Sequence, residues 1–290
     1  MKLLIIGKTG QLGSRLVEDA SGPGHEVIAP EKNDLDITDN ESFLGHVERF
    51  LPDVVINTAA FHNVPLCEIE AGKAFQLNCT SVRNMAGICN RFNSWFVTFS
   101  TDYVFDGEKK NPYLESDVPH PLQTYGISKL AGEYAARAYS DKSIIIRTCG
   151  LYGLQGASSK GGNFVDNRIT ESEKKSSLEM SSDQLVCPTY TGDLSKAVLR
   201  LIKDPAKESG IYHLVNEGYC TWFEFTKEIF RIMGIKTQVL PVDRKGKTGD
   251  MKRPLFSALK NEKAAKLGII LPHWKEALKE YLSIKYGLCQ

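Results

Sequence analysis

Short apolar runs alternate with amphipathic stretches through the first half of the chain, and this alternation restricts the fold more than any other feature. Five runs are rich in Val and Ile and hardly alternate, as expected of strands buried on both faces. They are LLIIG (3–7), HEVIAP (25–30), DVVINTAA (53–60), SWFVTFST (94–101) and SIIIRT (143–148). Helix-like segments lie between them at 11–20, 39–50, 70–92 and 122–139. The pattern predicts β-α-β units, and hence an α/β fold with a doubly wound, mainly parallel sheet.

The second half of the chain has a looser pattern. The Gly- and Ser-rich stretch 154–163 predicts a loop before a polar helix near 164–176. Thr221-Trp-Phe-Glu224 is a capping-box pattern that opens a helix to about Met233. We therefore expect one large domain over 1–150 and a smaller lobe over 151–290, with chain crossings back to the sheet.

Two further segments carry local signals. Thr38-Asp-Asn-Glu41 is a second capping-box pattern and marks the start of the helix after the second strand. The basic stretch RKGKTGDMKRP (244–254) fits a solvated loop better than a phosphate-facing one.

Composition excludes several classes of partner. The 290 residues include 36 Lys and Arg against 35 Asp and Glu, so a net charge of +1 gives no reason to expect a polyanion. The N-terminal apolar run is too short for the core of a signal peptide, and no window approaches the roughly 18 to 20 apolar residues of a membrane span. We expect a cytoplasmic protein with no nucleic-acid or membrane partner.

The cysteines and histidines do not form a metal site in the sequence. Seven cysteines are scattered along the chain with no C-x-x-C pair, and the six histidines are equally dispersed. Disulfide frameworks and zinc sites need regular spacing, so we expect reduced thiols and no structural metal.

A glycine-rich turn follows the first strand and opens the first helix. In Gly7-Lys-Thr-Gly10-Gln-Leu-Gly13 the glycines can serve the tight turn, the close approach of a pyrophosphate and helix–strand packing. This context predicts a dinucleotide site. The G-x-x-G-x-x-G spacing is typical of the short-chain dehydrogenase/reductase superfamily, so NADPH or NADH is the expected cofactor and the domain over 1–150 is the expected Rossmann-like, NAD(P)-binding domain.

The residues after the second strand leave the choice of cofactor open. Glu31 favours the free 2′-hydroxyl of NAD and Lys32 the 2′-phosphate of NADP. Asp36 and Ile37 are candidate contacts to the adenine edge. Ala59 and Ala60 follow the third strand and would let the cofactor pass close to the backbone.

Thr101, Tyr125 and Lys129 form the candidate catalytic group. Tyr125 and Lys129 are four residues apart in a predicted helix and so share a face. An ammonium beside a tyrosine favours the phenolate and lowers the phenol pKa from about 10. Thr101 ends the fourth strand, at the sheet edge where ligands bind. We expect Thr101 to orient a carbonyl or hydroxyl, Tyr125 to transfer a proton, and Lys129 to tune Tyr125 and hold the cofactor.

Several motifs, in one consistent order, resemble a known family. They are GKTGQLG, NTAAF, STDYVFDG, PYLESDVPHPLQTYGISKLAGE, CPTYTGDLSKAV and RPLFSAL. Together they resemble the dTDP-4-dehydrorhamnose reductase family of extended short-chain reductases. The resemblance implies reduction of a 4-keto-6-deoxy sugar nucleotide, bound by the lobe over 151–290, with Tyr125 as proton donor and Asp102 beside the sugar. The implied cofactor-binding residues are Gly7, Thr9, Gly10, Gln11, Leu12, Gly13, Asp36, Ile37, Ala59, Ala60, Phe61, Tyr125 and Lys129.

The chain departs from the family pattern at positions that concern the substrate. Gly150 stands where an aromatic residue is common, and Pro65 stands where an aspartate is usual. His62 replaces a small hydroxyl residue and is a candidate substrate contact, with a packed loop histidine as the alternative. Asn163 is a candidate contact in place of the missing aromatic.

Other functions remain open. A sugar-nucleotide epimerase would retain its nicotinamide, whereas a dehydratase would need a second carboxylate that Asp102-Tyr103 lacks. The β subunit of methionine adenosyltransferase, a relative that also retains the Tyr and Lys, makes an NADP-binding regulatory subunit without turnover a third alternative. A homodimer is an open alternative to a monomer.

Overall fold

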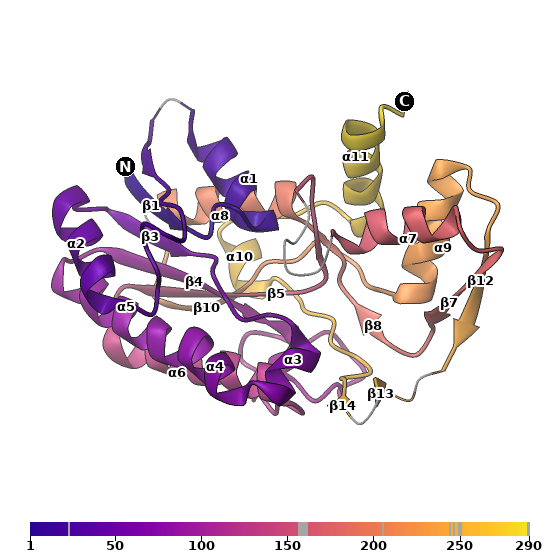
Figure 1. The fold of residues 1–290 in the computed structure, drawn as a ribbon, viewed down its shortest axis with the longest axis horizontal. Coiled ribbons are helices and arrows are strands. Elements are labelled where there is room, and N and C mark those ends of the chain that lie inside the picture. The colour runs from indigo at the N-terminus through magenta and orange to yellow at the C-terminus, as the bar shows by residue number, and fades with distance from the viewer. Residues whose placement is uncertain are drawn as a thin grey trace.

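The central sheet consists of six parallel strands (Figure 1). In spatial order they are β10 (Gly210–His213), β5 (Ser143–Thr148), β4 (Trp95–Thr101), β3 (Val54–Asn57), β1 (Lys2–Ile6) and β2 (Glu26–Ile28). The computed structural model describes residues 1–22, 24–155, 162–204, 206–243, 245, 247–248 and 251–288. The expected doubly wound, mainly parallel sheet is confirmed. Strand order reverses between β1 and β3, and open α/β sheets bind ligands beyond the carboxyl ends of the strands at such a point.

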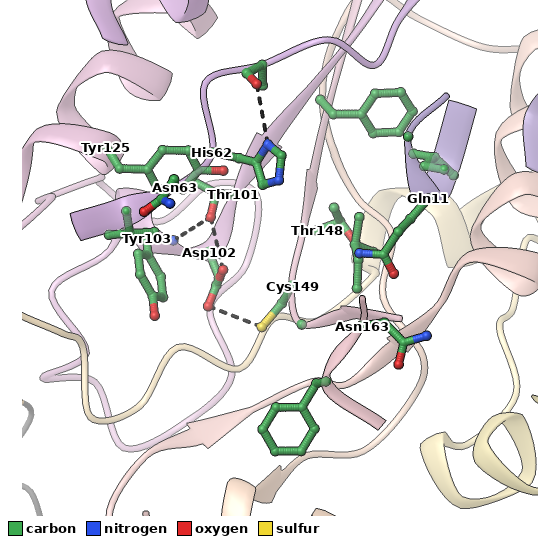
Figure 2. Close-up of a pocket in the computed structure, with 18 of the residues that line it drawn as sticks. Gln11, His62, Asn63, Thr101, Asp102, Tyr103, Tyr125, Thr148, Cys149 and Asn163 are labelled. Atoms are coloured by element: carbon green, nitrogen blue, oxygen red, sulfur yellow. Dashed lines mark hydrogen bonds between the residues drawn. The ribbon is translucent and has the colours of Figure 1, made fainter. Parts of the chain in front are cut away.

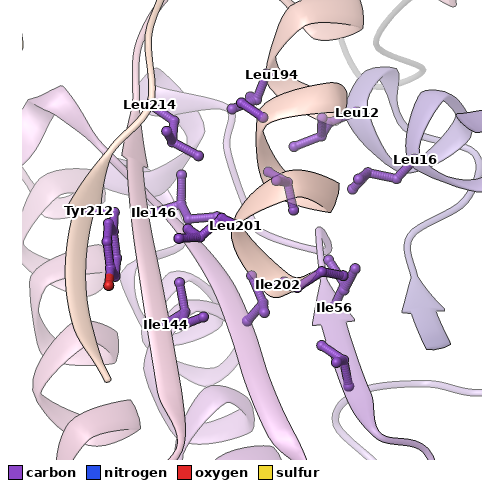
Figure 3. Close-up of a cluster of buried hydrophobic side chains, with 14 of the residues drawn as sticks. Leu12, Leu16, Ile56, Ile144, Ile146, Leu194, Leu201, Ile202, Tyr212 and Leu214 are labelled. Atoms are coloured by element: carbon purple, nitrogen blue, oxygen red, sulfur yellow. The ribbon is translucent and has the colours of Figure 1, made fainter. Parts of the chain in front are cut away.

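Helices cover both faces of the sheet. One face carries α1 (Gln11–Ala20), α8 (Thr191–Lys203) and α10 (Glu262–Lys266). The other carries α2 (Asn40–Phe50), α5 (Ser81–Arg91) and α6 (Thr124–Tyr139). Ile144 and Ile146 of β5 pack beneath α8 in the cluster of Figure 3, whereas Ile145 packs on the opposite face. Both faces of β5 are therefore buried, which explains why its sequence is apolar without alternation.

The helical stretch before β4 differs from the expected single helix over 70–92. It consists of α3 (Val64–Ile69), α4 (Ala71–Phe75), a π-helical segment η1 (Gln76–Thr80) and α5. In η1, the buried Asn78 side chain bonds the backbone N and O of Phe61 and the hydroxyl of Ser128 on α6. A buried amide needs such partners, and they fix the loop after β3 against α6. Short π-helical segments often occur at functional sites.

The second half of the chain builds a lobe from three helices and short paired strands. The helices α7 (Phe164–Ser172), α9 (Trp222–Met233) and α11 (Trp274–Tyr286) share one apolar cluster. The strand pairs are β12 (Gln238–Val242) with β7 (Ser177–Ser181), β11 (Cys220–Thr221) with β8 (Leu185–Val186), β6 (Leu151–Tyr152) with β9 (Thr189–Tyr190), and β13 (Lys247–Thr248) with β14 (Met251–Lys252). The same half also supplies β10 and α8 to the central sheet.

One of the two expected capping boxes forms. At the start of α9, Thr221 and Glu224 make both reciprocal hydrogen bonds, as predicted. The capping box predicted at Thr38 does not form, because Asp39 caps α2 and accepts hydrogen bonds from the backbone N of Glu41 and Ser42. Thr38 instead bonds the carboxylate of Asp36 through its backbone N and its hydroxyl, so the helix begins one residue later.

The described residues include no helix long and apolar enough to cross a membrane. Of the seven cysteines, all but Cys289 are described, and no disulfide joins any of these six. The described residues contain no group of three or more His, Cys, Asp or Glu side chains that could hold a metal ion.

Candidate active site

A cavity of about 600 Å³ lies where the carboxyl ends of the central strands face the second lobe (Figure 2). The turn after β1, the ends of β4 and β5, the helix α6 and the start of α7 all contribute to its wall. Of the residues proposed from the sequence, the cavity is lined by Gly10, Gln11, Leu12, Gly13, Ala60, His62, Thr101, Asp102, Tyr125, Lys129, Gly150 and Asn163.

The three glycines of the turn have different steric environments. A Cβ on Gly13 would lie 2.1 Å from the carbonyl oxygen of Gly7, and one on Gly7, whose φ is +88°, would lie 2.5 Å from Thr58 Oγ1. Close packing between strand and helix therefore explains these two glycines. A Cβ on Gly10 would meet only the oxygen of Gly7, at 3.4 Å, so the protein itself leaves room there. Gly10 keeps the cavity floor free of a side chain, as close approach of a phosphate requires.

Gln11 adds a second feature beside this turn. Its side chain lines the cavity, and its Oε1 is buried without a hydrogen-bond partner among the described residues. A buried polar atom without a partner costs free energy unless a ligand or water satisfies it. The turn thus offers an open floor and an unused acceptor to a ligand.

Six of the proposed cofactor residues do not line the cavity: Gly7, Thr9, Asp36, Ile37, Ala59 and Phe61. Thr9 is exposed, and Ile37 is buried in the core beneath α2. The Asp36 carboxylate bonds Thr38, and these bonds lower its pKa. Ala59 packs against the same core as Ile37, and Phe61 is tied by its backbone to Asn78.

Thr101, Tyr125 and Lys129 meet at the cavity, as the sequence predicted. Thr101 is the last residue of β4 and precedes the 3-10 helix η2 (Asp102–Val104); Tyr125 and Lys129 lie one turn apart on α6. The Thr101 hydroxyl donates to Asp102 Oδ1 at 3.1 Å and accepts from the backbone N of Tyr103 at 3.2 Å.

In the cofactor-free protein the Tyr125 pKa is raised, whereas the sequence predicted that it would be lowered. Burial is the main influence and raises the Tyr125 pKa well above its ordinary value; the nearby Asp102 acts in the same direction. The interaction with the Thr101 hydroxyl acts the opposite way. The Tyr125 hydroxyl is therefore protonated at neutral pH, the state in which it can donate a proton.

Lys129 is 5% exposed, and burial lowers its pKa to about 8, with Glu133 and Cys67 acting in the opposite direction. Within the described part of the chain, Lys129 makes no hydrogen bond or ion pair, although it lines the cavity. Its ammonium is thus available to a ligand.

Asp102 is held by three donors inside the protein. Its carboxylate accepts hydrogen bonds from Ser257 Oγ at 2.5 Å, Cys149 Sγ at 3.1 Å and Thr101 Oγ1 at 3.1 Å. Burial raises the Asp102 pKa, and these donors oppose the shift. The carboxylate borders the cavity, but its hydrogen bonds serve to fix the end of β4.

His62 and Gly150 also border the cavity. His62 Nδ1 lies 3.4 Å from the carbonyl oxygen of Ala60 (Figure 2). Gly150 has a φ of +56°, and a Cβ there would lie 3.2 Å from Pro188 Cα and 3.5 Å from Trp222 Cη2. An aromatic side chain at 150 would need a different backbone, and the ring of Trp222 already lies beside this position.

Trp222 forms an aromatic pair that its sequence context did not predict. Its ring lies 4.4 Å, centroid to centroid, from that of Phe164, and both rings line the cavity. The capping box at Thr221 placed Trp222 at the start of a helix but gave no sign that the ring faces the cavity.

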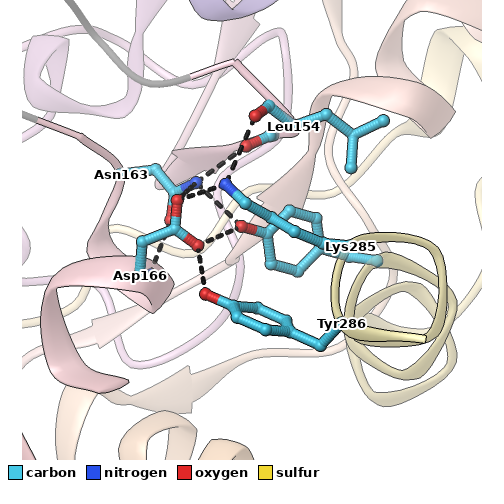
Figure 4. A network of polar contacts seen from close by, with 7 residues as sticks. Leu154, Asn163, Asp166, Lys285 and Tyr286 are labelled. Carbon is cyan, nitrogen blue, oxygen red and sulfur yellow. Dashed lines mark hydrogen bonds and ion pairs between the residues drawn. The ribbon is translucent and has the colours of Figure 1, made fainter. Parts of the chain in front are cut away.

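Asn163 differs from its expected role. Its Oδ1 caps α7 through the backbone N of Asp166, and its Nδ2 donates to Gly153 O, Asp166 Oδ2 and Tyr281 OH. Figure 4 shows this amide inside a network that also joins Asp166 to Lys285 and Tyr286 of α11. The side chain therefore supports the cavity wall, and its amide NH2 donates within the protein.

Arg253 brings a second cation to the cavity. Its Nη1 donates to Tyr103 OH at 3.2 Å, and its Nε is buried without a partner in the described part of the chain. The prediction of a solvated loop over 244–254 is therefore wrong at Arg253, because this side chain lines the cavity. Residues 244, 246, 249 and 250 of the same segment lie outside the described residues.

The chain is similar to known proteins in both sequence and fold. The family model "RmlD substrate binding domain" matches residues 1–286. The spore coat polysaccharide biosynthesis protein SpsK of Bacillus subtilis is 38% identical, with 99% of each chain covered. A crystal structure of a dTDP-4-dehydrorhamnose reductase from Clostridium acetobutylicum has a TM-score of 0.91 at 37% identity, covering 98% of this chain and 99% of that one.

A second solved structure carries a ligand. The dTDP-4-dehydrorhamnose reductase of Bacillus anthracis, in complex with NADP, has a TM-score of 0.89 at 33% identity, covering 97% of this chain and 98% of that one. Matches of this extent, over both the strand-end cavity and the second lobe, place the chain in the dTDP-4-dehydrorhamnose reductase family of extended short-chain dehydrogenases/reductases.

Proposed function

We propose that the chain reduces the 4-keto group of a 4-keto-6-deoxy sugar nucleotide with NADPH or NADH, and that Tyr125 donates the proton. The observation that carries the proposal is the meeting of Thr101, Tyr125 and Lys129 with the Gly10 turn around one cavity. In this proposal residues 1–150 bind the cofactor and residues 151–290 supply most substrate contacts.

The cofactor fits the residues of the turn. The open floor at Gly10 and the unpartnered Gln11 Oε1 face the space that a pyrophosphate and its ribose need. The Lys129 ammonium would hold the nicotinamide ribose. NADPH is the favoured form, because the Bacillus anthracis relative contains NADP and because Lys8 neutralises Glu31 through a 2.8 Å ion pair.

A reduced nicotinamide, when bound, supplies the hydride for carbon 4. The protein's own groups handle the proton. Tyr125 is protonated at neutral pH and lies beside Thr101, so its hydroxyl can deliver a proton to the sugar oxygen. The Thr101 hydroxyl positions the same oxygen. The resulting phenolate would be stabilised by the Lys129 ammonium one helix turn away.

The second lobe would bind the rest of the substrate. The cation of Arg253 suits a diphosphate, and the rings of Trp222 and Phe164 suit the flat face of a base or the apolar face of a sugar. His62 remains a candidate contact to the sugar.

The test is oxidation of NADPH and NADH, followed at the nicotinamide absorbance, with 4-keto-6-deoxy sugars attached to different nucleotides. We expect oxidation that depends on one sugar nucleotide and consumes one cofactor per substrate. Product formed without net cofactor oxidation would indicate an epimerase. NADPH binding without turnover on any sugar would indicate a regulatory subunit.

A further inference from the structure

Three ionisable side chains lie four residues apart along one face of α6. They are Tyr125, Lys129 and Glu133, and Lys129 is in the middle. Side chains four residues apart on a helix are neighbours, so the Glu133 carboxylate is within reach of the Lys129 ammonium. An ion pair between them would draw the ammonium along the helix and away from the cavity. The structure has no such pair between these two described residues.

Glu133 instead accepts hydrogen bonds from two other side chains. Arg147 of β5 donates hydrogen bonds to both carboxylate oxygens, with Nε at 2.9 Å from Oε1 and Nη2 at 2.7 Å from Oε2. The Ser100 hydroxyl donates to Oε1 as well. The side chains of Glu133 and Arg147 are 2% and 1% exposed, so water does not compete for these bonds. A planar guanidinium matches a carboxylate with two parallel bonds, which a lysine cannot do.

In the described part of the chain, Arg147 forms no ion pair besides the one with Glu133. Its guanidinium lies 5.0 Å from the centre of the Phe105 ring, and its Nη1 is buried without a partner among the described residues. His213, also near Arg147, is neutral because burial and the guanidinium lower its pKa to about 3. Among the described residues, Glu133 and the Cys67 thiol are the ionisable groups that raise the Lys129 pKa against the effect of burial. The choice of partner for Glu133 thus decides where the Lys129 ammonium points.

We propose that Arg147 is a positioning residue, which by occupying the carboxylate of Glu133 keeps the ammonium of Lys129 directed into the cavity. The consequence for the cofactor rests on the proposed function, in which Lys129 holds the nicotinamide ribose. The placement of the ammonium itself does not depend on any reaction, and it can be tested in the cofactor-free protein.

The first test measures the reactivity of Lys129 with acetic anhydride as a function of pH, by mass spectrometry of the labelled peptide. The exposed Lys110 in the same sample is the internal reference. For the wild type we expect a midpoint near pH 8 for Lys129. In Arg147→Met the freed carboxylate should pair with Lys129 and raise the midpoint by roughly 1 to 3 units, the usual effect of an adjacent opposite charge.

Two further variants separate pairing from loss of structure. Glu133→Gln combined with Arg147→Met removes both charges, so the midpoint should return to the wild-type value or below. A merely unfolded cavity would expose Lys129 in the double variant too, and its midpoint would stay high. Arg147→Lys keeps a buried cation and so protects the fold if Arg147→Met does not fold; its single ammonium should leave one oxygen of Glu133 free and give a smaller upward shift.

NADPH titration by fluorescence supplies the functional readout. Arg147→Met should bind NADPH at least about 10-fold more weakly, and the double variant should recover most of that loss; tenfold corresponds to about 1.4 kcal/mol. A midpoint that is unchanged in both single variants, or one that stays raised in the double variant, would overturn the proposal. If the Lys129 midpoints shift as expected but NADPH affinity does not change, the positioning of Lys129 by Arg147 would be supported. The assigned role of Lys129 in cofactor binding would then be contradicted.

Discussion

The Ser257 hydroxyl donates a 2.5 Å hydrogen bond to the Asp102 carboxylate, which lies 155 residues earlier in the chain. Both side chains are buried, at 1% and 4% exposure. Asp102 also accepts a hydrogen bond from the Thr101 hydroxyl, so the Ser257 bond connects a segment near the C-terminus to a side chain that lines the cavity. The second lobe thereby helps to fix the end of β4.

Removing this donor should weaken both stability and catalysis. Ser257→Ala leaves a buried carboxylate with one bond fewer, and we expect the free energy of unfolding to fall by about 1 to 3 kcal/mol. Urea unfolding of the cofactor-free protein measures the loss, and kcat should fall because Thr101 is less firmly held. Cys149→Ser is the matched control, since it keeps a donor to the same carboxylate. Equal stability of Ser257→Ala and wild type would contradict the role of the bond.

Substitutions at two glycines of the turn should affect different properties of the protein. Gly13→Ala places a Cβ 2.1 Å from the Gly7 carbonyl oxygen, so the helix must shift and the cofactor-free protein should lose stability. Gly10→Ala meets its nearest described neighbour at 3.4 Å and should leave that stability nearly unchanged while weakening NADPH binding. Thermal unfolding and NADPH titration of both variants measure the difference. Full NADPH affinity in Gly10→Ala would show that the open floor serves no ligand.

The sequence predicted the fold well because its signals are local. Unalternating apolar runs mark strands buried on both faces, and β5 satisfies that reading with Ile145 on one face and Ile144 on the other. The order of strand, glycine turn and helix also placed Gly10, Thr101, Tyr125 and Lys129 at one edge of the sheet. These positions follow from the chain direction and the helix period alone.

Contacts between distant segments could not be predicted in the same way. Trp222 and Arg253 reach the cavity from the second lobe, and Ser257 reaches the Asp102 carboxylate. Nothing in their local sequence states which way these side chains face. Asn163 was expected to contact the substrate in place of a missing aromatic residue, yet its side chain caps α7 and bonds Tyr281 of α11. The direction of the Tyr125 pKa shift was also missed, since burial, which raises this pKa, depends on the assembled fold.

Disrupting the hydrogen-bond network at Asp166 should lower the stability of the second lobe locally. Its carboxylate accepts from Tyr281 at 2.5 Å, from Tyr286 at 2.9 Å, and from Asn163 and Lys285 (Figure 4). Asp166→Asn replaces one acceptor oxygen with a donor and removes the charge that pairs with Lys285. We expect a loss of about 1 to 3 kcal/mol and faster hydrogen exchange in α11.

The control for this network is Tyr286→Phe, which removes a single hydroxyl from a partly exposed ring and should cost less than Asp166→Asn. Hydrogen exchange followed by mass spectrometry localises the effect. Unchanged exchange in α11 of Asp166→Asn would show that the helix is held by its apolar contacts alone.

If Tyr125 is the proton donor, removing its hydroxyl should slow turnover without weakening cofactor binding. Tyr125→Phe removes the hydroxyl but keeps the ring, which packs edge-on against Tyr103 at 6.2 Å between centroids. We expect kcat to fall by roughly 10² to 10⁴-fold with NADPH affinity close to wild type. Steady-state turnover and NADPH titration measure the two effects. Wild-type turnover in this variant would assign the proton to another group.

The pKa of Lys129 predicts the pH dependence of cofactor binding. With a pKa of about 8, the side chain is a cation below that pH and neutral above it. If the ammonium holds the cofactor, NADPH affinity should stay level below about pH 7 and fall as the pH rises through about 8. Lys129→Met should bind NADPH more weakly below pH 8 and lack this decline, whereas Lys110→Met, at an exposed site, should match the wild type. Isothermal titration across this pH range measures the affinity, and a level profile for the wild type up to about pH 9.5 would contradict the role of the Lys129 charge.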